Sequence, residues 1–224
     1  MIWFIKNSIT RKNLMAITGL FLSFFLIIHL AGNLQLLLPE AEARLQYNAY
    51  SDFLGGNPLI LAVSFVLYAC ILLHTIDAIY LAFRRKKANG VSYSRDRRGR
   101  ASTWYSRHMM ALGIIIFVFL VIHFKDYWYV YKFGDLPLDE NGKKDLYTLV
   151  VVSFEQLWYV ILYVIAIIAL GYHLLHGVFS AHRTIGLFHP VYNRIIKILG
   201  ILFSIAITIG YIIIPIFIYI SHQA

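Results

Sequence analysis

Cysteine is almost absent from the sequence, and acidic residues are scarce. Cys70 is the single cysteine among 224 residues. One thiol excludes a disulfide framework, a zinc site built from thiolates and the C-x-x-C-H motif of covalent haem attachment. Aspartate and glutamate together number 11, against 20 lysines and arginines. Any bound cofactor must therefore use ligands other than cysteine.

Apolar residues make up 60% of the chain, well above the share typical of a soluble domain. A spanning helix needs about 20 mostly apolar residues, because each backbone polar group in hydrocarbon must be satisfied within its own segment. Five stretches have that length, with ends defined to within about 2–4 residues. They are residues 14–38, 59–83, 109–130, 154–181 and 195–220. The sequence predicts an all-α membrane protein that forms a single domain over residues 1–224.

The positive charges lie at one end of these stretches. Fifteen of the 20 lysines and arginines precede the first stretch or fall in the second and fourth loops, nine of them between Arg84 and Arg107. By the positive-inside rule these segments face the cytoplasm. We therefore expect a multi-pass membrane protein, surrounded by lipid, with a cytoplasmic N-terminus. We expect no nucleic-acid partner, because little chain remains to form a soluble basic surface.

The nine histidines separate into an interfacial group and a membrane group. Four lie at predicted water interfaces, where an imidazole costs little free energy: His108, His182, His189 and His222. Five lie within the apolar stretches: His29, His74, His123, His173 and His176. A polar ring there needs a partner, so a functional role is the default interpretation. Interhelical hydrogen bonds of about 0.6 kcal/mol would explain one or two such rings, but they explain a histidine in each of four helices less well.

The depth of these histidines defines two layers. Depth is counted from the basic residues at the positively charged end of each helix. Arg84 follows His74 by ten residues and Arg183 follows His176 by seven, which places both histidines about 10–15 Å from that end at 1.5 Å per residue. His29 follows Lys12 by 17 residues and His123 follows Arg107 by 16, which places both about 25 Å from it. We call these the inner and outer layers. His173, three residues before His176, is a second candidate for the inner layer.

Two histidines at equal height on facing helices can ligate one iron from both sides. We therefore expect two b-type haems inside a bundle of the first four helices. The outer haem would lie between His29 and His123, and the inner haem between His74 and His176, with His173 as the second choice. Such ligation fills both axial positions and favours electron transfer over chemistry at the iron, so no catalytic residue is assigned.

Charged residues near the inner layer have assignments of their own. Arg107 and Arg183 are candidate partners for haem propionates. Asp77 is one turn from His74 on the same helical face. Pairing of Asp77 with an arginine at the inner end is favoured over a role in proton movement or ligand orientation. The fifth helix contains no histidine, and no chemistry is assigned to it.

The segments around the membrane histidines resemble the cytochrome b membrane anchor of succinate dehydrogenases and fumarate reductases, in its single-chain, five-helix, di-haem form. They are HLAGNL from His29, LHTIDA from Leu73, VIHFKDYW from Val121 and HLLHGVFS from His173. In that family each of the first four helices supplies one haem ligand. The ligand of the fourth is followed by glycine, which favours His176. Some di-haem fumarate reductases have a glutamate linked to proton movement two residues before that ligand, where this chain has Leu174.

The resemblance also implies a location in the bacterial inner membrane, and it implies partners. A flavoprotein with covalent FAD and an iron–sulfur protein would perform the succinate chemistry. The anchor would dock the iron–sulfur protein on its basic face and pass electrons through both haems to or from a quinone, expected to be menaquinone. Neither the direction of the reaction nor the quinone pocket follows from the sequence.

Other interpretations stay open. The cytochrome b anchor of a hydrogenase or formate dehydrogenase would carry a similar haem relay, and its partner subunits would distinguish it. A transporter or structural membrane protein would use the histidines only for hydrogen bonds or proton transfer, and it would show no haem absorbance. An intramembrane serine hydrolase is disfavoured, because the sequence has no G-x-S-x-G motif.

Overall fold

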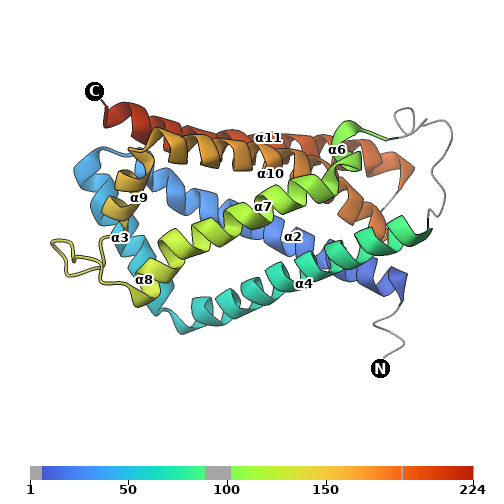
Figure 1. Cartoon of the computed structure of the whole chain (residues 1–224), viewed down its shortest axis with the longest axis horizontal. Coiled ribbons are helices and arrows are strands. Elements are labelled where there is room, and N and C mark those ends of the chain that lie inside the picture. Colours follow the sequence, from blue (N-terminus) through green and yellow to red (C-terminus); the bar gives the residue numbers. More distant parts are fainter. Residues whose placement is uncertain (1–6, 89–101, 188, 224) are drawn as a thin grey trace.

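The computed structural model describes residues 7–88, 102–187 and 189–223, with the backbone alone for 85–88. Within these residues, five helices are long and apolar enough to cross a membrane: Ser8–Leu37, Pro58–Arg84, Met109–Phe133, Leu157–Thr184 and Pro190–Ser221. They lie side by side as a bundle (Figure 1). The prediction of an all-helical protein with five spans is thereby confirmed.

The helices are continuous in some spans and interrupted in others. The first span is α2 (Ser8–Asn33) followed by a 3-10 turn (Leu34–Leu37), and the second is α4 (Pro58–Ala88). The third consists of α7 (Met109–His123), a π-helical turn (Phe124–Tyr129) and α8 (Val130–Phe133). The last two are α10 (Leu157–Thr184) and α11 (Pro190–Ser221). The shorter helices α3 (Glu40–Gly56), α6 (Trp104–Arg107) and α9 (Leu146–Phe154) lie between spans.

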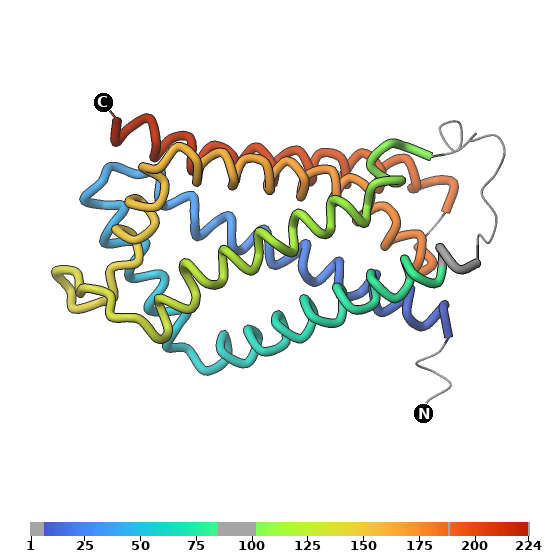
Figure 2. Tube along the Cα trace, in the orientation of Figure 1, coloured from blue at the N-terminus to red at the C-terminus, as the bar shows by residue number. Residues whose placement is uncertain are grey.

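The loops gather at two ends of the bundle, because successive spans run in opposite directions. We call the end where α2 begins the Ser8 end, and the end where α11 finishes the Ser221 end. Figure 2 shows α3, α9 and the loop of residues 134–145 together at the Ser221 end. The start of α2 and the end of α11 thus lie at opposite ends, as an odd number of spans requires.

Local sequence signals mark where the helices begin and end. The Asn7 side chain accepts a hydrogen bond of 3.0 Å from the Ile9 N–H at the start of α2, which satisfies one of the free donors of the first turn. Pro190 opens α11, where its missing N–H is not needed. Gly186 follows the end of α10 with φ +86°, a conformation that glycine adopts without steric cost.

Two features of the fold differ from the sequence prediction. Helices α3 and α9 are absent from that prediction. Glu155 and Gln156 separate α9 from the fourth span, which begins at Leu157, close to the expected start at residue 154. Helix α3 is amphipathic: it buries Ala43, Tyr47 and Asn48, while its first turn carries two glutamates. A search for long apolar runs cannot detect such a helix, because its apolar face is diluted by its polar one.

Helix α10 is the most enclosed of the five spans. In the most apolar segment of α10, 44% of the residues are buried within the molecule, compared with 6% in the spans that contain α4 and α7. Its contact with α11 is close, because a Cβ built on Gly171 would lie 2.4 Å from Thr208 Oγ1. Small residues at such contacts allow membrane helices to approach closely.

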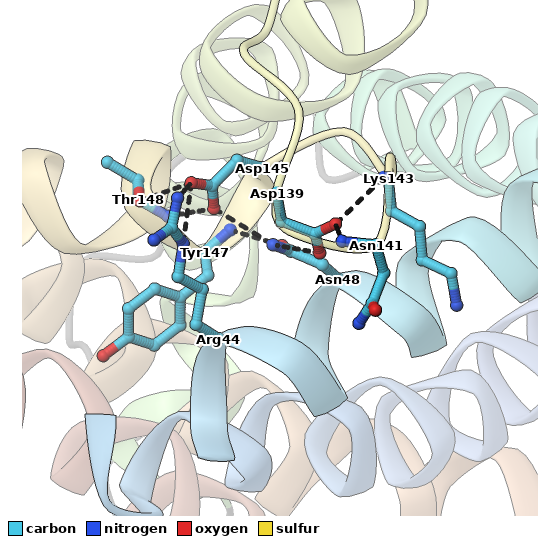
Figure 3. A network of polar contacts seen from close by, with 8 residues as sticks. All are labelled: Arg44, Asn48, Asp139, Asn141, Lys143, Asp145, Tyr147 and Thr148. Atoms are coloured by element: carbon cyan, nitrogen blue, oxygen red, sulfur yellow. Dashed lines mark hydrogen bonds and ion pairs between the residues drawn. The ribbon is translucent and has the colours of Figure 1, made fainter. Parts of the chain in front are cut away.

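A buried polar network fastens α3 to the chain before α9 (Figure 3). Asp145, whose side chain is 1% exposed, accepts hydrogen bonds from Arg44 Nε at 2.9 Å and Nη2 at 2.6 Å. Asn48 Nδ2 donates to Asp145 Oδ1 at 3.0 Å and to Asp139 Oδ2 at 3.2 Å. Asn48 also accepts from the Tyr147 N–H at 2.9 Å. The network holds α3 as a cap across the Ser221 end.

Asp145 is ionised within this network. Burial alone would raise the pKa of its carboxyl, but hydrogen bonds from Arg44, Asn48 and Thr148 outweigh burial and lower the pKa to about 2. The same pair raises the pKa of the Arg44 guanidinium. The cap is therefore fastened by charge-assisted hydrogen bonds, which are stronger than neutral ones.

A candidate site of paired histidines

A cavity of about 1620 Å³ lies between the five spans. Ligand pockets for small molecules usually enclose about 300–1,000 Å³, so this cavity can hold more than one large group. Its lining extends from Lys12 and Arg84 near the Ser8 end to Tyr50 and Tyr131 near the other end. All five membrane histidines line it: His29, His74, His123, His173 and His176.

The outer layer contains one pair of facing rings. His29 of α2 and His123, the last residue of α7, have ring centroids 5.8 Å apart and planes at 82°. Phe25 stacks on His29 at 5.3 Å, and Phe119 stacks on His123 at 5.6 Å. The two residues that depth alone paired are thus brought together, and we call them the outer pair.

The inner layer also contains a pair, but its α10 member is His173. The rings of His74 and His173 have centroids 6.3 Å apart. His176, our first choice from the sequence, lines the same cavity, yet the described structure has no ring contact between it and His74. Three positions along a helix turn a side chain by about 300° and move it about 4.5 Å, which is enough to change its partner. We call His74 and His173 the inner pair.

Three of the four paired rings have a neighbour at Nδ1. His123 Nδ1 lies 3.0 Å from Tyr163 Oη, and His74 Nδ1 lies 3.2 Å from Thr18 Oγ1. His29 Nδ1 has a longer contact, 3.4 Å, with Asn33 Nδ2. His173 Nδ1 is buried and has no hydrogen-bond partner among the described residues. A histidine that binds a metal through Nε2 usually donates its Nδ1–H to a neighbour. The hydroxyl oxygens of Tyr163 and Thr18 can accept such a bond, whereas the Asn33 amide nitrogen can only donate.

The centroid distances within each pair are close to the distance that ligation of one metal from both sides would require. Two metal–nitrogen bonds of about 2 Å on opposite sides of an ion, plus the radii of two imidazole rings, add to about 6 Å. Within the described part of the chain, no group of three or more His, Cys, Asp or Glu side chains could hold a bare metal ion. Paired axial ligands instead suit an iron whose equatorial ligands come from a macrocycle.

The Ser8 side of the inner pair is tightly built. A Cβ built on Gly19 would lie 3.1 Å from Cε1 of His74, so glycine lets α2 pass directly over this ring. Asp77, which is 2% exposed, forms an ion pair with Arg11. The prediction that Asp77 pairs with an arginine at this end is confirmed. The Arg11 guanidinium also lies 4.0 Å from the ring centroid of Tyr80.

The arginines assigned to propionates lie elsewhere. Arg107 donates to the Ser102 carbonyl, and the Arg183 guanidinium carbon lies 5.9 Å from the ring centroid of Phe179. Neither residue lines the cavity, whereas Lys12 and Arg84 do. Most of the basic loop between Arg84 and Arg107 lies outside the described residues.

The fifth helix contributes to the cavity, although the sequence analysis assigns it no chemistry. Tyr211 of α11 has its ring centroid 5.9 Å from that of His29, and its hydroxyl donates to the Leu26 carbonyl at 2.9 Å. Ile214 and Pro215 line the cavity beside it. The feature of the sequence that could have indicated this contribution is the presence of a tyrosine within an isoleucine-rich helix.

None of the four interfacial histidines lines the cavity: His108, His182, His189 and His222.

No protein-family model, no curated protein and no solved structure matches the chain.

Proposed function

We propose that the chain is a di-haem cytochrome b that anchors a succinate:quinone oxidoreductase in a bacterial cytoplasmic membrane. Its axial ligands would be the outer pair, His29 and His123, and the inner pair, His74 and His173. The observation that supports this most is that two histidine pairs, with centroids 5.8 and 6.3 Å apart, lie at two depths of one cavity. A bound haem supplies one-electron transfer, and two of them would carry electrons between the two ends of the bundle.

The protein's own part in this function is to hold and orient the rings and to exclude water. Side-chain hydroxyls of Tyr163 and Thr18 hold the Nδ1 sides of His123 and His74, which directs their Nε2 atoms away from those partners. Phe25 and Phe119 restrict the outer rings by stacking. Lys12 and Arg84, at the Ser8 end of the cavity, replace Arg107 and Arg183 as our candidates for binding haem propionates.

The proposed partners are a flavoprotein with FAD, an iron–sulfur protein and a quinone, for which menaquinone is our candidate. The sequence resemblance suggests them. The charge distribution agrees with docking at the Ser8 end, because Arg11, Lys12, Arg84 and Arg183 all belong to that end. This end would face the cytoplasm by the positive-inside rule.

The first experiment is a reduced-minus-oxidised spectrum with a pyridine haemochrome assay on the purified chain, expressed with haem available. We expect two b-type haems per polypeptide. A chain that contains none would refute the proposal and favour a transporter or structural protein.

The assignment of the pairs is tested by substitution. We expect His123→Ala to remove one spectral component and His74→Ala to remove the other. His173→Ala should behave as His74→Ala does, while His176→Ala should retain both haems. His182→Ala is the matched control, because its Nδ1 lies 2.8 Å from the Val178 carbonyl of its own helix. Loss of the same component from His123→Ala and His74→Ala would contradict the pairing.

Partner identification separates the proposed complex from other cytochrome b anchors. We expect purification of the chain from its native membrane to recover a subunit with covalent flavin and one with iron–sulfur clusters. Recovery of a nickel or molybdenum subunit instead would assign the anchor to a hydrogenase or a formate dehydrogenase.

A further inference from the structure

A continuous chain of hydrogen bonds leads from the outer pair towards the Ser221 end. His123 Nδ1 lies 3.0 Å from Tyr163 Oη, and Tyr163 Oη lies 3.2 Å from Tyr159 Oη. The Tyr159 hydroxyl donates to Asp126 Oδ2 at 3.0 Å. Tyr159 and Tyr163 are 4% and 5% exposed, while the side chain of Asp126 is 26% exposed. Two buried tyrosine hydroxyls therefore connect the His123 ring to one carboxylate near the surface.

The carboxylate sets the direction of every bond in the chain. An ionised carboxylate can only accept hydrogen bonds, so Tyr159 uses its proton on Asp126. Tyr163 must then donate to the Tyr159 oxygen, and its own oxygen accepts the Nδ1–H of His123. Lys125 Nζ donates to the other oxygen, Asp126 Oδ1, at 3.1 Å. His123 is thereby held as the tautomer whose Nε2 lone pair is free.

The backbone at this site is unusual as well. The residues directly after His123, Phe124–Tyr129, form a π-helical turn. Such turns are rare and occur frequently at functional sites. This one carries Asp126 and the buried Tyr127, whose ring centroid is 5.3 Å from that of His123.

The inner pair has no equivalent chain among the residues that the structure describes. His173 Nδ1 has no hydrogen-bond partner among them. His74 Nδ1 contacts the Thr18 hydroxyl, whose own proton is given to the Leu14 carbonyl at 2.8 Å. That contact ends on a neutral backbone group, whereas the chain from His123 ends on a charge.

We propose that Asp126, Tyr159 and Tyr163 are positioning residues that act on the outer iron ligand through a carboxylate-anchored hydrogen-bond chain. This inference rests on the proposed haem function. Hydrogen bonding at Nδ1 fixes the tautomer of a ligand imidazole and raises its basicity. A more basic axial ligand stabilises the oxidised iron and lowers its reduction potential. The hydrogen-bond chain thus sets the reduction potential of the outer haem separately from that of the inner haem.

The test is a spectroelectrochemical titration of the purified holoprotein, with the outer component identified as the one that His123→Ala removes. We expect Asp126→Asn, Tyr159→Phe and Tyr163→Phe each to shift the midpoint potential of the outer component upward while leaving that of the inner component unchanged. All three variants should retain two haems. Tyrosine to phenylalanine removes only a hydroxyl, so the packing of α10 is preserved.

Two control variants distinguish an effect of the hydrogen-bond chain from the mere loss of a negative charge or of a hydroxyl. Asp135→Asn removes one exposed negative charge from the same end of the bundle, and Tyr172→Phe removes a hydroxyl from the same helix outside the chain. Both should leave the two midpoints in place. An upward shift with Asp126→Asn but none with Tyr163→Phe would show a through-space charge effect and overturn the proposal, as would equal shifts of both components. A wild-type protein without haem would refute the proposed function itself.

Discussion

Asp145 holds its charge although its side chain is almost completely buried. Because its folded-state pKa of about 2 lies below the unfolded value of about 3.9, ionisation of this group stabilises the fold above about pH 4. This contribution decreases as the pH falls from about 4 towards 2, because protonation removes the acceptor of the Arg44 hydrogen bonds. Asp139, which shares Asn48 with it, has its pKa lowered as well: burial opposes the shift, and hydrogen bonds from Lys143, Asn48 and Asn141 outweigh it.

We therefore expect Asp145→Asn to lower the free energy of unfolding at pH 7 by about 1–2 kcal/mol, a range that allows for solvent screening near the loop surface. The difference from the wild type should shrink as the pH approaches 2. Thermal unfolding in detergent at a series of pH values measures it. Asp135→Asn, at an exposed position of the same loop, should match the wild type throughout, and a pH-independent deficit in Asp145→Asn would disprove the ionic explanation.

The histidines show which features of the site can be predicted from the sequence and which cannot. Depth follows from counting residues along a helix, so the sequence alone pairs His29 with His123. The rotation of a helix about its axis depends on its neighbours, so counting cannot choose between His173 and His176. Tyr163 was missed because 40 residues separate it from His123. Its spacing from Tyr159, four positions on the same apolar helix, was the signal available.

Helices differ in how well the sequence predicts them. The five spans are predictable because the free energy of inserting an apolar segment is nearly a local property. Helix α3 forms because Ala43, Tyr47 and Asn48 pack against the bundle, and the Asn48 contacts to Asp139 and Asp145 are 91 and 97 residues distant in sequence. Long-range contacts of this kind leave no periodic apolar run, so the cap could not be predicted.

The contact between α10 and α11 gives a prediction at this scale. Gly171→Ala would place a methyl group 2.4 Å from Thr208 Oγ1, and we expect overpacking to lower stability by about 1–3 kcal/mol. Gly200→Ala is the matched control in the same contact, because its Cβ would meet Val178 Cγ1 at an ordinary 3.5 Å. Thermal unfolding in detergent compares the two. Equal stability of both variants would show that α10 and α11 can move apart without a loss of stability.

For the whole molecule, the positive-inside rule predicts which end faces which compartment. In a Cys70→Ala background, a cysteine placed by Asp135→Cys at the Ser221 end should react with a membrane-impermeant maleimide added to intact spheroplasts. One placed by Leu187→Cys, in the turn between α10 and α11 at the Ser8 end, should react only after the membrane is permeabilised. The reverse pattern would invert the proposed topology.

The cavity of about 1620 Å³ also affects how long the polypeptide survives in the cell. A group that binds only the folded bundle adds its binding free energy to the stability of the fold. If haem is that group, chains made during haem shortage will unfold more readily and be cleared by membrane proteases. The number of complexes in the membrane would then follow haem supply after translation, without any change in gene expression.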